Sequence, residues 1–260
     1  MFYEDMIPLP FKPKVTETGE NKALFEISAL YPGYGITIGS SLRRVLLSSL
    51  PGAAVTQVKI KGVQHEFSTI PNVLEDVIMI ILNLKKLRFK LHGDESQTGI
   101  IKVKGEKEIK GKDIELPSQV EIVSKDVHIA TLTAKKAELE MEIQIENGIG
   151  YESVERRKKE KLEIGVIALD AVFSPIKRVS YKVENMRVGE RTDFDKLTLE
   201  IETDGVITPR QAFQQALEIL IKHFSLFVDE KEEIKIPEGK KKPKRVLKDK
   251  KKPKKAKKKK

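Results

Sequence analysis

Apolar and polar residues alternate strictly in several stretches of the chain, which is the pattern of a strand with one buried face. From Glu138 to Glu146, every second residue is Leu, Met or Ile, and the residues between them are Glu or Gln. The same alternation predicts strands at Leu87–Leu91, Val179–Val183 and Leu197–Ile201. Shorter apolar segments predict further strands near residues 24–27, 55–60, 100–103 and 120–123.

Three segments change to helical spacing. The first follows Ile36–Gly39 and ends before Pro51. The second runs from Val77 to Leu84, and we expect Asn72 to cap it, with Glu75 three positions on. The third opens with Thr208-Pro209-Arg210-Gln211, where Thr can cap, Pro suits the first helical position and Gln can reach back. Helices among strands predict an α+β fold.

The third helix carries an unusually wide apolar stripe. Between Phe213 and Val228, large apolar residues recur every three or four positions. The stripe can pack on the sheet of the same chain, or part of it can pack against a second copy. The pattern leaves both interpretations open.

The net charge of +10 is concentrated in one segment. Residues 239–260 hold 15 of the 49 Lys and Arg and one of the 39 Asp and Glu, a net charge of +14. The rest of the chain carries 34 basic and 38 acidic residues, or −4, so its charge predicts no general affinity for nucleic acid. We expect residues 231–260 to be a disordered Lys-rich tail. The charged stretch 150–161 predicts a mobile surface loop.

Few residue patterns point to catalysis or metal binding. The chain has no cysteine, which excludes disulfides, thiolate metal sites and cysteine nucleophiles. Its four histidines lack zinc-ligand spacing, and no phosphate-binding glycine loop occurs. The longest apolar run is Val77–Leu82, far short of the ~20 residues that span a bilayer. We therefore expect a cytoplasmic protein with no catalytic residue, metal or cofactor of its own, and the patterns alone predict no function.

A series of short motifs follows in order along the chain. They are Leu42–Gly52 (Leu-Arg-Arg-Val-Leu-Leu-Ser-Ser-Leu-Pro-Gly), His65–Thr69 (His-Glu-Phe-Ser-Thr), Asp170–Pro175 (Asp-Ala-Val-Phe-Ser-Pro), Arg191–Leu197 (Arg-Thr-Asp-Phe-Asp-Lys-Leu) and Glu200–Gly205 (Glu-Ile-Glu-Thr-Asp-Gly). Together they resemble the N-terminal domain of bacterial-type DNA-directed RNA polymerase α subunits, over about residues 10–229. Their colinearity makes the resemblance specific.

The resemblance implies two interleaved subdomains. Residues 1–50 plus 169–230 would form an α/β dimerisation subdomain, and residues 51–168 an inserted, mostly β subdomain. In the family, one copy of the dimer docks on the β subunit and the other on the β′ subunit, and the full enzyme also holds ω and sigma. The chain is then expected to be a homodimeric scaffold that nucleates polymerase assembly, a non-catalytic subunit of a nucleotidyltransferase.

The resemblance also implies contact residues, among which arginine offers a planar fork of donors suited to interfaces. The β-subunit contacts are Arg43, Arg44, Leu47, His65, Glu66, Phe67, Ser68, Thr69 and Lys85. The β′-subunit contacts are Phe173, Ser174, Pro175, Lys177, Arg187, Arg191, Asp193 and Lys196. The dimer contacts are Ile38, Leu42, Val45, Leu46, Phe213, Leu217, Leu220, Ile221, Phe224 and Phe227.

Family members usually continue into a small helical C-terminal domain, and we expect the Lys-rich tail to stand in its place. The tail predicts nonselective binding of DNA or RNA that weakens steeply with salt, through Lys240, Lys241, Lys242, Lys244 and Arg245. The alternative function is a free-standing dimeric nucleic-acid-binding protein that acts through this tail. As part of a polymerase, the chain would lie in the cytoplasm at the nucleoid, with a plastid form as the alternative and no membrane partner.

Overall fold

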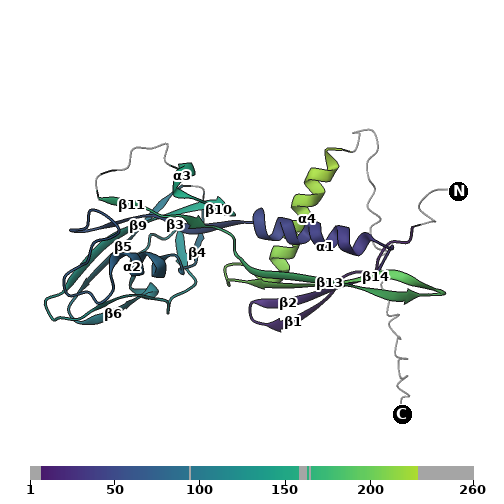
Figure 1. Cartoon of the computed structure of the whole chain (residues 1–260), viewed down its shortest axis with the longest axis horizontal. Coiled ribbons are helices and arrows are strands. Elements are labelled where there is room, and N and C mark those ends of the chain that lie inside the picture. The colour runs from purple at the N-terminus through teal and green to yellow at the C-terminus, as the bar shows by residue number, and fades with distance from the viewer. Residues whose placement is uncertain (1–6, 94, 158–162, 164, 228–260) are drawn as a thin grey trace, which may run out of the picture.

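The structure is a computed structural model that describes residues 7–93, 95–157, 163 and 165–227. Two units lie end to end along the long axis of the molecule (Figure 1). The helix-covered unit holds β1 (Lys14–Gly19), β2 (Lys22–Leu30), α1 (Tyr34–Ser48), β13 (Ile176–Val188), β14 (Arg191–Thr203) and α4 (Pro209–Ser225). No helix among these described residues is long and apolar enough to cross a membrane.

The β-rich unit lies between the two parts of the helix-covered unit in sequence. It holds β3 (Pro51–Ile60), α2 (Val77–Leu84), β4 (Phe89–Leu91), β5 (Gln97–Lys104), β6 (Lys107–Lys110), the 3-10 helix η2 (Gly111–Asp113), β7 (Val120–Ile122), β8 (His128–Leu132), β9 (Glu138–Ile149), β10 (Tyr151–Glu152), α3 (Val154–Arg157) and β11 (Val166–Ala168). The short strand β12 (Ala171–Val172) pairs with β10 at the joint between the units. The predicted α+β fold with an inserted, mostly β unit is confirmed.

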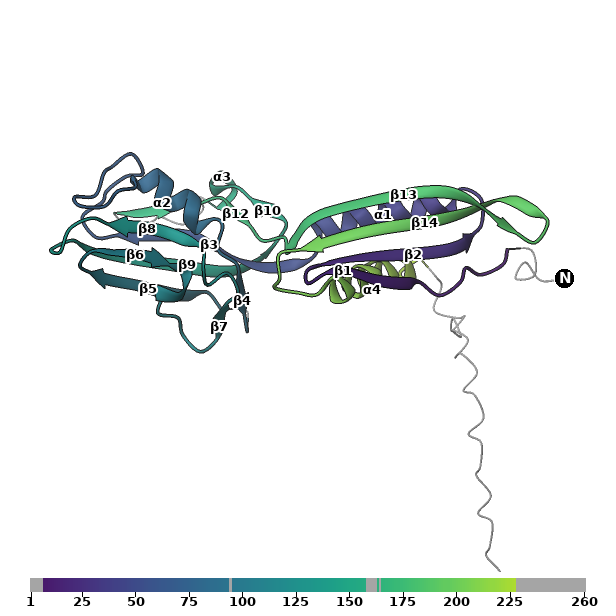
Figure 2. The same cartoon turned by 90° about the horizontal axis from the view of Figure 1, so that it is seen from below.

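The helix-covered unit is an antiparallel sheet in the order β1-β2-β14-β13 with both helices on one face (Figure 2). The alternation predicted in β14 places Leu197, Leu199 and Ile201 in the core without solvent exposure. α1 contributes Leu42 and Leu46 to the same core. The sheet therefore buries one side of each helix and leaves the other side uncovered.

α1 begins earlier than predicted, at Tyr34, because its first turn is capped from a distant strand. One carboxylate oxygen of Asp195 in β14 accepts hydrogen bonds from the N–H of Gly33 at 2.9 Å and of Gly35 at 3.0 Å. A Cβ on Gly35 would lie 2.7 Å from Val183, and one on Gly39 would lie 2.8 Å from Tyr181. These glycines, one turn apart, let the helix approach the sheet closely.

α4 begins as predicted at the Thr208 cap. The Thr208 hydroxyl accepts from the Gln211 N–H at 3.3 Å, and the Gln211 side chain accepts from the Thr208 N–H at 3.0 Å. This reciprocal capping box satisfies two N–H groups that the first turn leaves without helical partners. Further along, the Phe213 ring stacks on Phe25 of β2, with centroids 4.4 Å apart.

The β-rich unit closes a core of its own around a sheet in the order β5-β9-β3-β4-β7, with β11 paired to β3. The alternation predicted for β9 is confirmed, since Leu139, Met141, Ile143 and Ile145 are buried. Strands are also present at each of the four weaker sites, as β2, β3, β5 and β7.

The predicted cap of α2 is wrong. Asp76, rather than Asn72, caps the helix, because its carboxylate accepts from the Met79 N–H at 2.8 Å. Glu75 turns instead toward β8, where it accepts from the N–H and hydroxyl of Thr131. Of the two adjacent acidic residues, Asp76 thus caps the helix and Glu75 bonds to the neighbouring strand.

The prediction of an irregular loop over residues 150–161 is also partly wrong. Tyr151 and Glu152 form β10, which pairs with β12, and α3 follows directly. The Asp170 carboxylate accepts from the Val154 N–H at 2.9 Å and so anchors the start of α3 beside the joint. Residues 158–162 lie outside the described part of the chain.

Candidate protein interaction surfaces

The outer side of α1 presents three of the residues predicted to contact the β subunit. Arg43, Arg44 and Leu47 are exposed, whereas Leu42 and Leu46 on the opposite side are buried against the sheet. Helical periodicity separates the two sides, since Gly35, Gly39, Leu42 and Leu46 recur at three or four positions. An apolar side chain that is 39% exposed beside two arginines is the chemistry of a protein contact.

The segment His65–Thr69 forms an exposed turn before α2. The Ser68 hydroxyl lies 3.2 Å from His65 Nδ1, and the Ser68 carbonyl accepts from the Val77 N–H at 3.3 Å. These bonds hold the turn against the first residue of the helix. Phe67 projects from it with 75% of its surface exposed, and the neighbours Glu66 and Thr69 are also exposed. An apolar ring this exposed is available to a partner.

Lys85 follows the end of α2, about 12 Å along the helix axis from the start of α2. Its ammonium lies 3.5 Å from the Asp170 carboxylate. The pKa of Asp170 is lowered by the hydrogen bond from Val154 and by the charge of Lys85. The lysine is therefore held at the joint by an ion pair, and 31% of its side chain is exposed.

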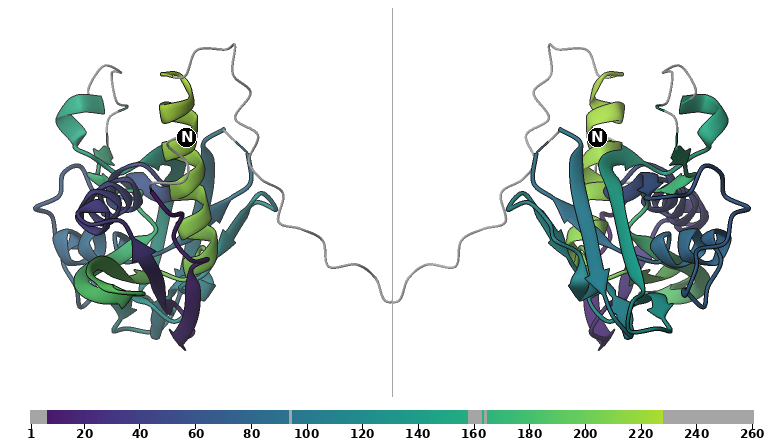
Figure 3. Two further views of the ribbon diagram at one scale, coloured as in Figure 1. Left: turned by 90° about the vertical axis from the view of Figure 1, so that its right-hand side faces the viewer. Right: turned by 90° about the vertical axis from the view of Figure 1, so that its left-hand side faces the viewer.

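The β10–β12 ribbon connects α1 to Lys85. A Cβ on Gly150, just before β10, would lie 3.2 Å from the Ser48 carbonyl at the end of α1. The Gly150 carbonyl accepts from the Phe173 N–H at 2.8 Å, close to Asp170 in the chain. Figure 3 shows α1, α2 and α3 on the same flank of the molecule. The structure thus brings the residues predicted for the β subunit to one flank, from both units.

Several exposed apolar residues on this flank were not predicted as contacts. Tyr151 in β10 is 60% exposed and stands opposite the exposed Val172 in β12, and Ile149, two residues before Tyr151, is also exposed. On α2, Ile78, Met79 and Leu82 are exposed although Val77, Ile80, Ile81 and Leu84 are buried. The signal for α2 was its uninterrupted apolar run, because a helix that is apolar all round needs cover on every side. No alternation marked Tyr151 or Val172, and Val172 was not singled out as a contact although it lies within the Asp170–Pro175 motif.

The residues predicted for the β′ subunit lie in two places. Phe173 and Pro175 are buried at the joint, with Ser174 half-buried beside them and Lys177 exposed at the start of β13. The others lie at or near the far turn of the β13–β14 hairpin: Arg187, Arg191, Asp193 and Lys196. Ten residues of extended strand separate Lys177 from Arg187, or about 33 Å. The two places form no single compact patch.

The hairpin turn is organised around Arg191. Its guanidinium makes two hydrogen bonds to the Asp193 carboxylate, at 3.0 and 2.6 Å, and this pairing lowers the pKa of Asp193. The same guanidinium lies over the rings of Phe194 and Tyr31, at 5.1 and 5.6 Å from their centroids. Lys196 pairs with Glu26 of β2 at 3.1 Å. The turn is a charged, preorganised end to a long hairpin.

The residues predicted for the dimer differ in how far the chain already covers them. Leu42, Leu46 and Phe213 are buried in the core of the helix-covered unit. A second group is half-buried, namely Ile38, Val45, Leu217 and Leu220. The last turns of α4 are open, with Ile221, Phe224 and Phe227 exposed to 61%, 62% and 84%. Only the half-buried and exposed groups can touch a partner directly.

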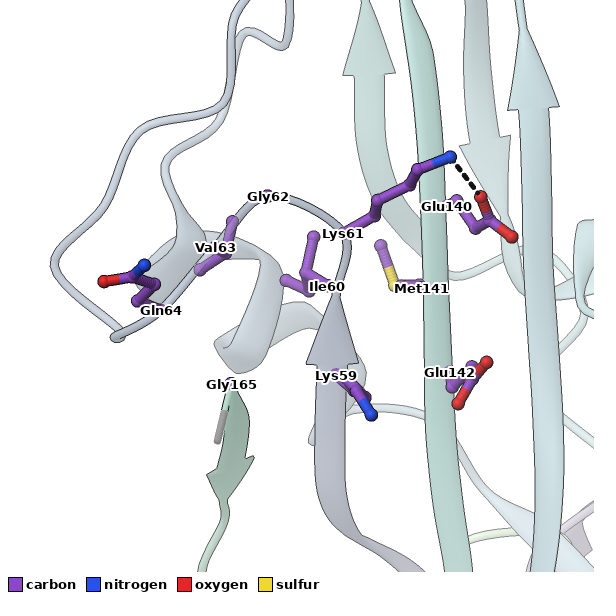
Figure 4. Close-up of a pocket in the computed structure, with 10 residues that line it drawn as sticks. All are labelled: Lys59, Ile60, Lys61, Gly62, Val63, Gln64, Glu140, Met141, Glu142 and Gly165. Carbon is purple, nitrogen blue, oxygen red and sulfur yellow. Dashed lines mark hydrogen bonds and ion pairs between the residues drawn. The ribbon is translucent and has the colours of Figure 1, made fainter. Parts of the chain in front are cut away.

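A hollow of about 570 Å³ opens beside the end of β3, between Lys61–Gln64 and β9 (Figure 4). Lys61 and Lys102 bond to the Glu140 carboxylate at 2.9 and 2.8 Å, and these bonds lower the pKa of Glu140 to about 2. None of the predicted contact residues lines this hollow. Its polar wall is a set of ion pairs on the solvent side of the β-rich sheet.

Two further predictions stay as they were. The described ranges contain no group of three or more His, Cys, Asp or Glu arranged to hold a metal ion. The nucleic-acid residues predicted in the tail (Lys240, Lys241, Lys242, Lys244 and Arg245) lie outside the described part of the chain. Their binding of DNA or RNA is therefore still a prediction from composition.

The fold and its surfaces define a protein built to contact other proteins, with an insert of recognisable type. Residues 58–174 match the family model described as the RNA polymerase Rpb3/RpoA insert domain. A DNA-directed RNA polymerase subunit alpha of Carboxydothermus hydrogenoformans is 52% identical over 220 residues, which cover 84% of this chain and 70% of the relative. The same protein of Symbiobacterium thermophilum is 49% identical over 219 residues, covering 83% and 69%.

The chain belongs to the family of DNA-directed RNA polymerase α subunits. It is accordingly a component of the polymerase complex, a nucleotidyltransferase. The family resemblance expected from the ordered motifs is confirmed.

Proposed function

We propose that the chain is the scaffold on which the polymerase assembles. Two copies dimerise through the open end of α4, the flank of α1 and α2 docks the β subunit, and the β13 edge docks the β′ subunit. The chain supplies no catalytic residue and works in the cytoplasm as part of the nucleoid-bound enzyme. The observation that carries this proposal is the set of large apolar side chains that the chain leaves uncovered on its helices.

The end of α4 supports self-association. Ile221, Phe224 and Phe227 follow one another at intervals of three residues, so they share one side of the helix and its continuation. Aromatic side chains of this kind bury large areas and anchor interfaces when a partner covers them. Half-buried Leu217 and Leu220 extend the same stripe toward the sheet. A second copy would cover this stripe with an identical one.

The flank of α1 supports docking of the β subunit. Arg43 and Arg44 make no ion pair in the described structure, so their guanidinium groups are available for carboxylates of a partner. Leu47 and Phe67 supply apolar anchors on the two units. Charged forks around buried apolar groups are the usual composition of interface hot spots.

The β13 edge supports docking of the β′ subunit. β13 ends the sheet order of the helix-covered unit, so one of its sides has no strand partner there. An interface of standard size covers roughly 800 Å² per partner and is roughly 30 Å across. A partner lying along β13 would therefore reach both Lys177 and the Arg191 turn. Phe173 and Pro175 are buried and would not touch the partner; they would contribute indirectly, by fixing the position of the start of β13.

The proposal is tested by the order of assembly. Purified β and β′ subunits are mixed with and without the full-length chain, and the complexes are separated by size. The scaffold function predicts that β and β′ associate stably only when the chain is present. Equal association of β with β′ in its absence would contradict the proposal.

A further inference from the structure

The joint between the two units is held from two sides. The chain crosses it twice, between Leu50 and Pro51 and again between Leu169 and Ile176. On one side, Phe173 packs with Ala54 and Ala171 over glycine backbone. A Cβ on Gly148 would lie 2.5 Å from the Phe173 ring, so this apolar contact needs the glycine. Figure 2 shows β10 and β12 on this side and β4 and β7 on the opposite one.

An ion pair closes the opposite side. Arg88 directly precedes β4 in the β-rich unit, and Asp204 directly follows β14 in the helix-covered unit. Their side chains meet with 3.2 Å between Arg88 Nε and Asp204 Oδ2. Asp204 has only 4% of its side chain exposed, and burial raises its pKa although the Val206 N–H and Arg88 both favour the carboxylate.

Arg88 is itself fixed within the β-rich unit. Its Nη1 donates to the carbonyls of Lys85 and Leu87 at 2.8 and 2.9 Å. Its N–H donates to the Ser124 hydroxyl, and its carbonyl accepts from the Val123 N–H. On the other unit, the Asp204 N–H donates to the Pro175 carbonyl at 3.0 Å. Each partner of the pair is thus a rigid part of its own unit.

We propose that Arg88 and Asp204 are positioning residues that set the angle between the two units. Phe173 is the contact on one side of the joint. The ion pair on the other side prevents the two units from rotating relative to each other about that contact. The angle matters because the residues proposed to dock the β subunit lie on both units, with Arg44 and Leu47 on α1 and the His65–Thr69 turn on the β-rich unit. This inference rests on the proposed docking function. Neither Arg88 nor Asp204 needs to touch the partner.

Loss of the ion pair should weaken docking of the β subunit. The docking residues on α1 and those on the β-rich unit would then no longer be held at a fixed angle to each other when the partner binds. Two linked binding groups gain from each other only when their geometry allows both to engage together. We expect an affinity for the β subunit about tenfold lower when the pair is removed. Dimerisation should be unchanged, since α4 lies wholly in one unit.

The test measures the angle directly. The chain has no native cysteine, so Lys104→Cys on β5 and Lys182→Cys on β13 place one spin label on each unit. Labelled full-length chain is diluted with unlabelled chain, so that distances are measured within one copy. Arg88→Met removes the charge and keeps the length, and Asp204→Asn keeps the side-chain volume and an acceptor for Val206. Lys102→Met, which breaks an ion pair inside the β-rich unit, is the matched control.

The expected result is a broader or shifted distance distribution in both joint variants, an unchanged one in the control, and weaker binding of the β subunit in the joint variants alone. An unchanged distribution in Asp204→Asn with intact melting behaviour would overturn the inference. A changed distribution with unchanged β-subunit binding would overturn the positioning role. If unaltered chain fails to bind the β subunit, the docking function falls, while the label distances still decide whether the pair sets the angle.

Discussion

The two units of the chain handle their apolar residues differently. The β-rich unit buries the alternating residues of its strands almost completely, with Ile101, Ile129 and Ile143 wholly covered. The helix-covered unit buries one side of its helices and leaves Phe224 and its neighbours in solvent. A unit closed on itself needs no partner for its stability, whereas one with an open apolar side gains from a partner. The difference indicates that self-association belongs to the helix-covered unit, whereas the β-rich unit closes its own core and exposes apolar side chains, such as Phe67 and those on α2, at the proposed docking flank.

The sharpest way to test the closed character of the β-rich unit is a cavity in it. Ile143→Ala in β9 removes buried methylene and methyl groups, and we expect the free energy of unfolding of that unit to fall by about 2–5 kcal/mol. Urea denaturation monitored for each unit measures this. Ile36→Ala, at an exposed isoleucine of α1, is the control and should change stability by less than about 0.5 kcal/mol. Similar decreases in the free energy of unfolding in both variants would contradict the proposed difference between a closed and an open unit.

The open side of the other unit is tested by truncating it. Phe224→Ala should weaken self-association by about 2 kcal/mol, since aromatic anchors at the centre of an interface dominate binding. Sedimentation equilibrium measures the dissociation constant of the dimer. Lys222→Ala, on an exposed charged residue of the same helix, should leave it unchanged. A Phe224→Ala dimer as tight as the original would mean that α4 is not the contact.

A smaller effect is expected on the docking flank. Arg44→Ala should preserve folding and dimerisation but lower the affinity for the β subunit by about tenfold, or ~1.4 kcal/mol. This affinity is measured by the binding of soluble chain to β subunit immobilised on a surface. Arg178→Ala, an exposed arginine on β13, is the matched control and should bind normally. Wild-type affinity in Arg44→Ala would count against the assignment of this flank.

The smallest expected effect concerns the acid stability of the β-rich unit. The bonds from Lys102 and Lys61 lower the pKa of Glu140 to about 2, so the carboxylate is more easily kept charged in the folded state than in the unfolded one. The contribution of the Glu140 carboxylate to the free energy of unfolding is complete above the pKa of the unfolded state, about 4.5, and is lost as the pH falls toward 2. Glu140→Gln should therefore flatten the fall of the urea midpoint in that window, by a small amount because the pair is exposed. An identical pH profile would contradict this.

Local patterns predicted the elements whose cause is local. Strict alternation predicted β9 and β14, and the Thr208 capping box predicted the start of α4, because the stabilising groups lie within a few residues. The start of α1 was missed because its cap, Asp195, lies about 160 residues away in the chain. No local pattern reveals such a contact. The cap of α2 was misplaced because both Asn72 and Asp76 are good capping residues. In the structure the Asp76 carboxylate accepts from the Met79 N–H, whereas Asn72 is bonded through its backbone carbonyl to Thr133.

The predicted contact residues show the same limit. Exposure of Arg43 and Arg44 follows from helical periodicity, so their place on the outer side of α1 could be predicted. Burial of Phe173 could not, because its ring lies against Gly148 and its backbone carbonyl against Gly52, two glycines on other strands. The distance between Lys177 and Arg187 follows from the length of β13, which the alternation over Val179–Val183 underestimated. The exposed Tyr151–Val172 pair depends on a strand pairing across the joint.

The most direct test of the scaffold is the composition of its first complex. Full-length chain is mixed with the β subunit from the same source, and the mass of the complex is determined by sedimentation or native mass spectrometry. The account predicts two copies of the chain with one β subunit, formed through the open side of α4 and the flank of α1. A chain that stays monomeric, or a dimer that does not bind the β subunit, would contradict it.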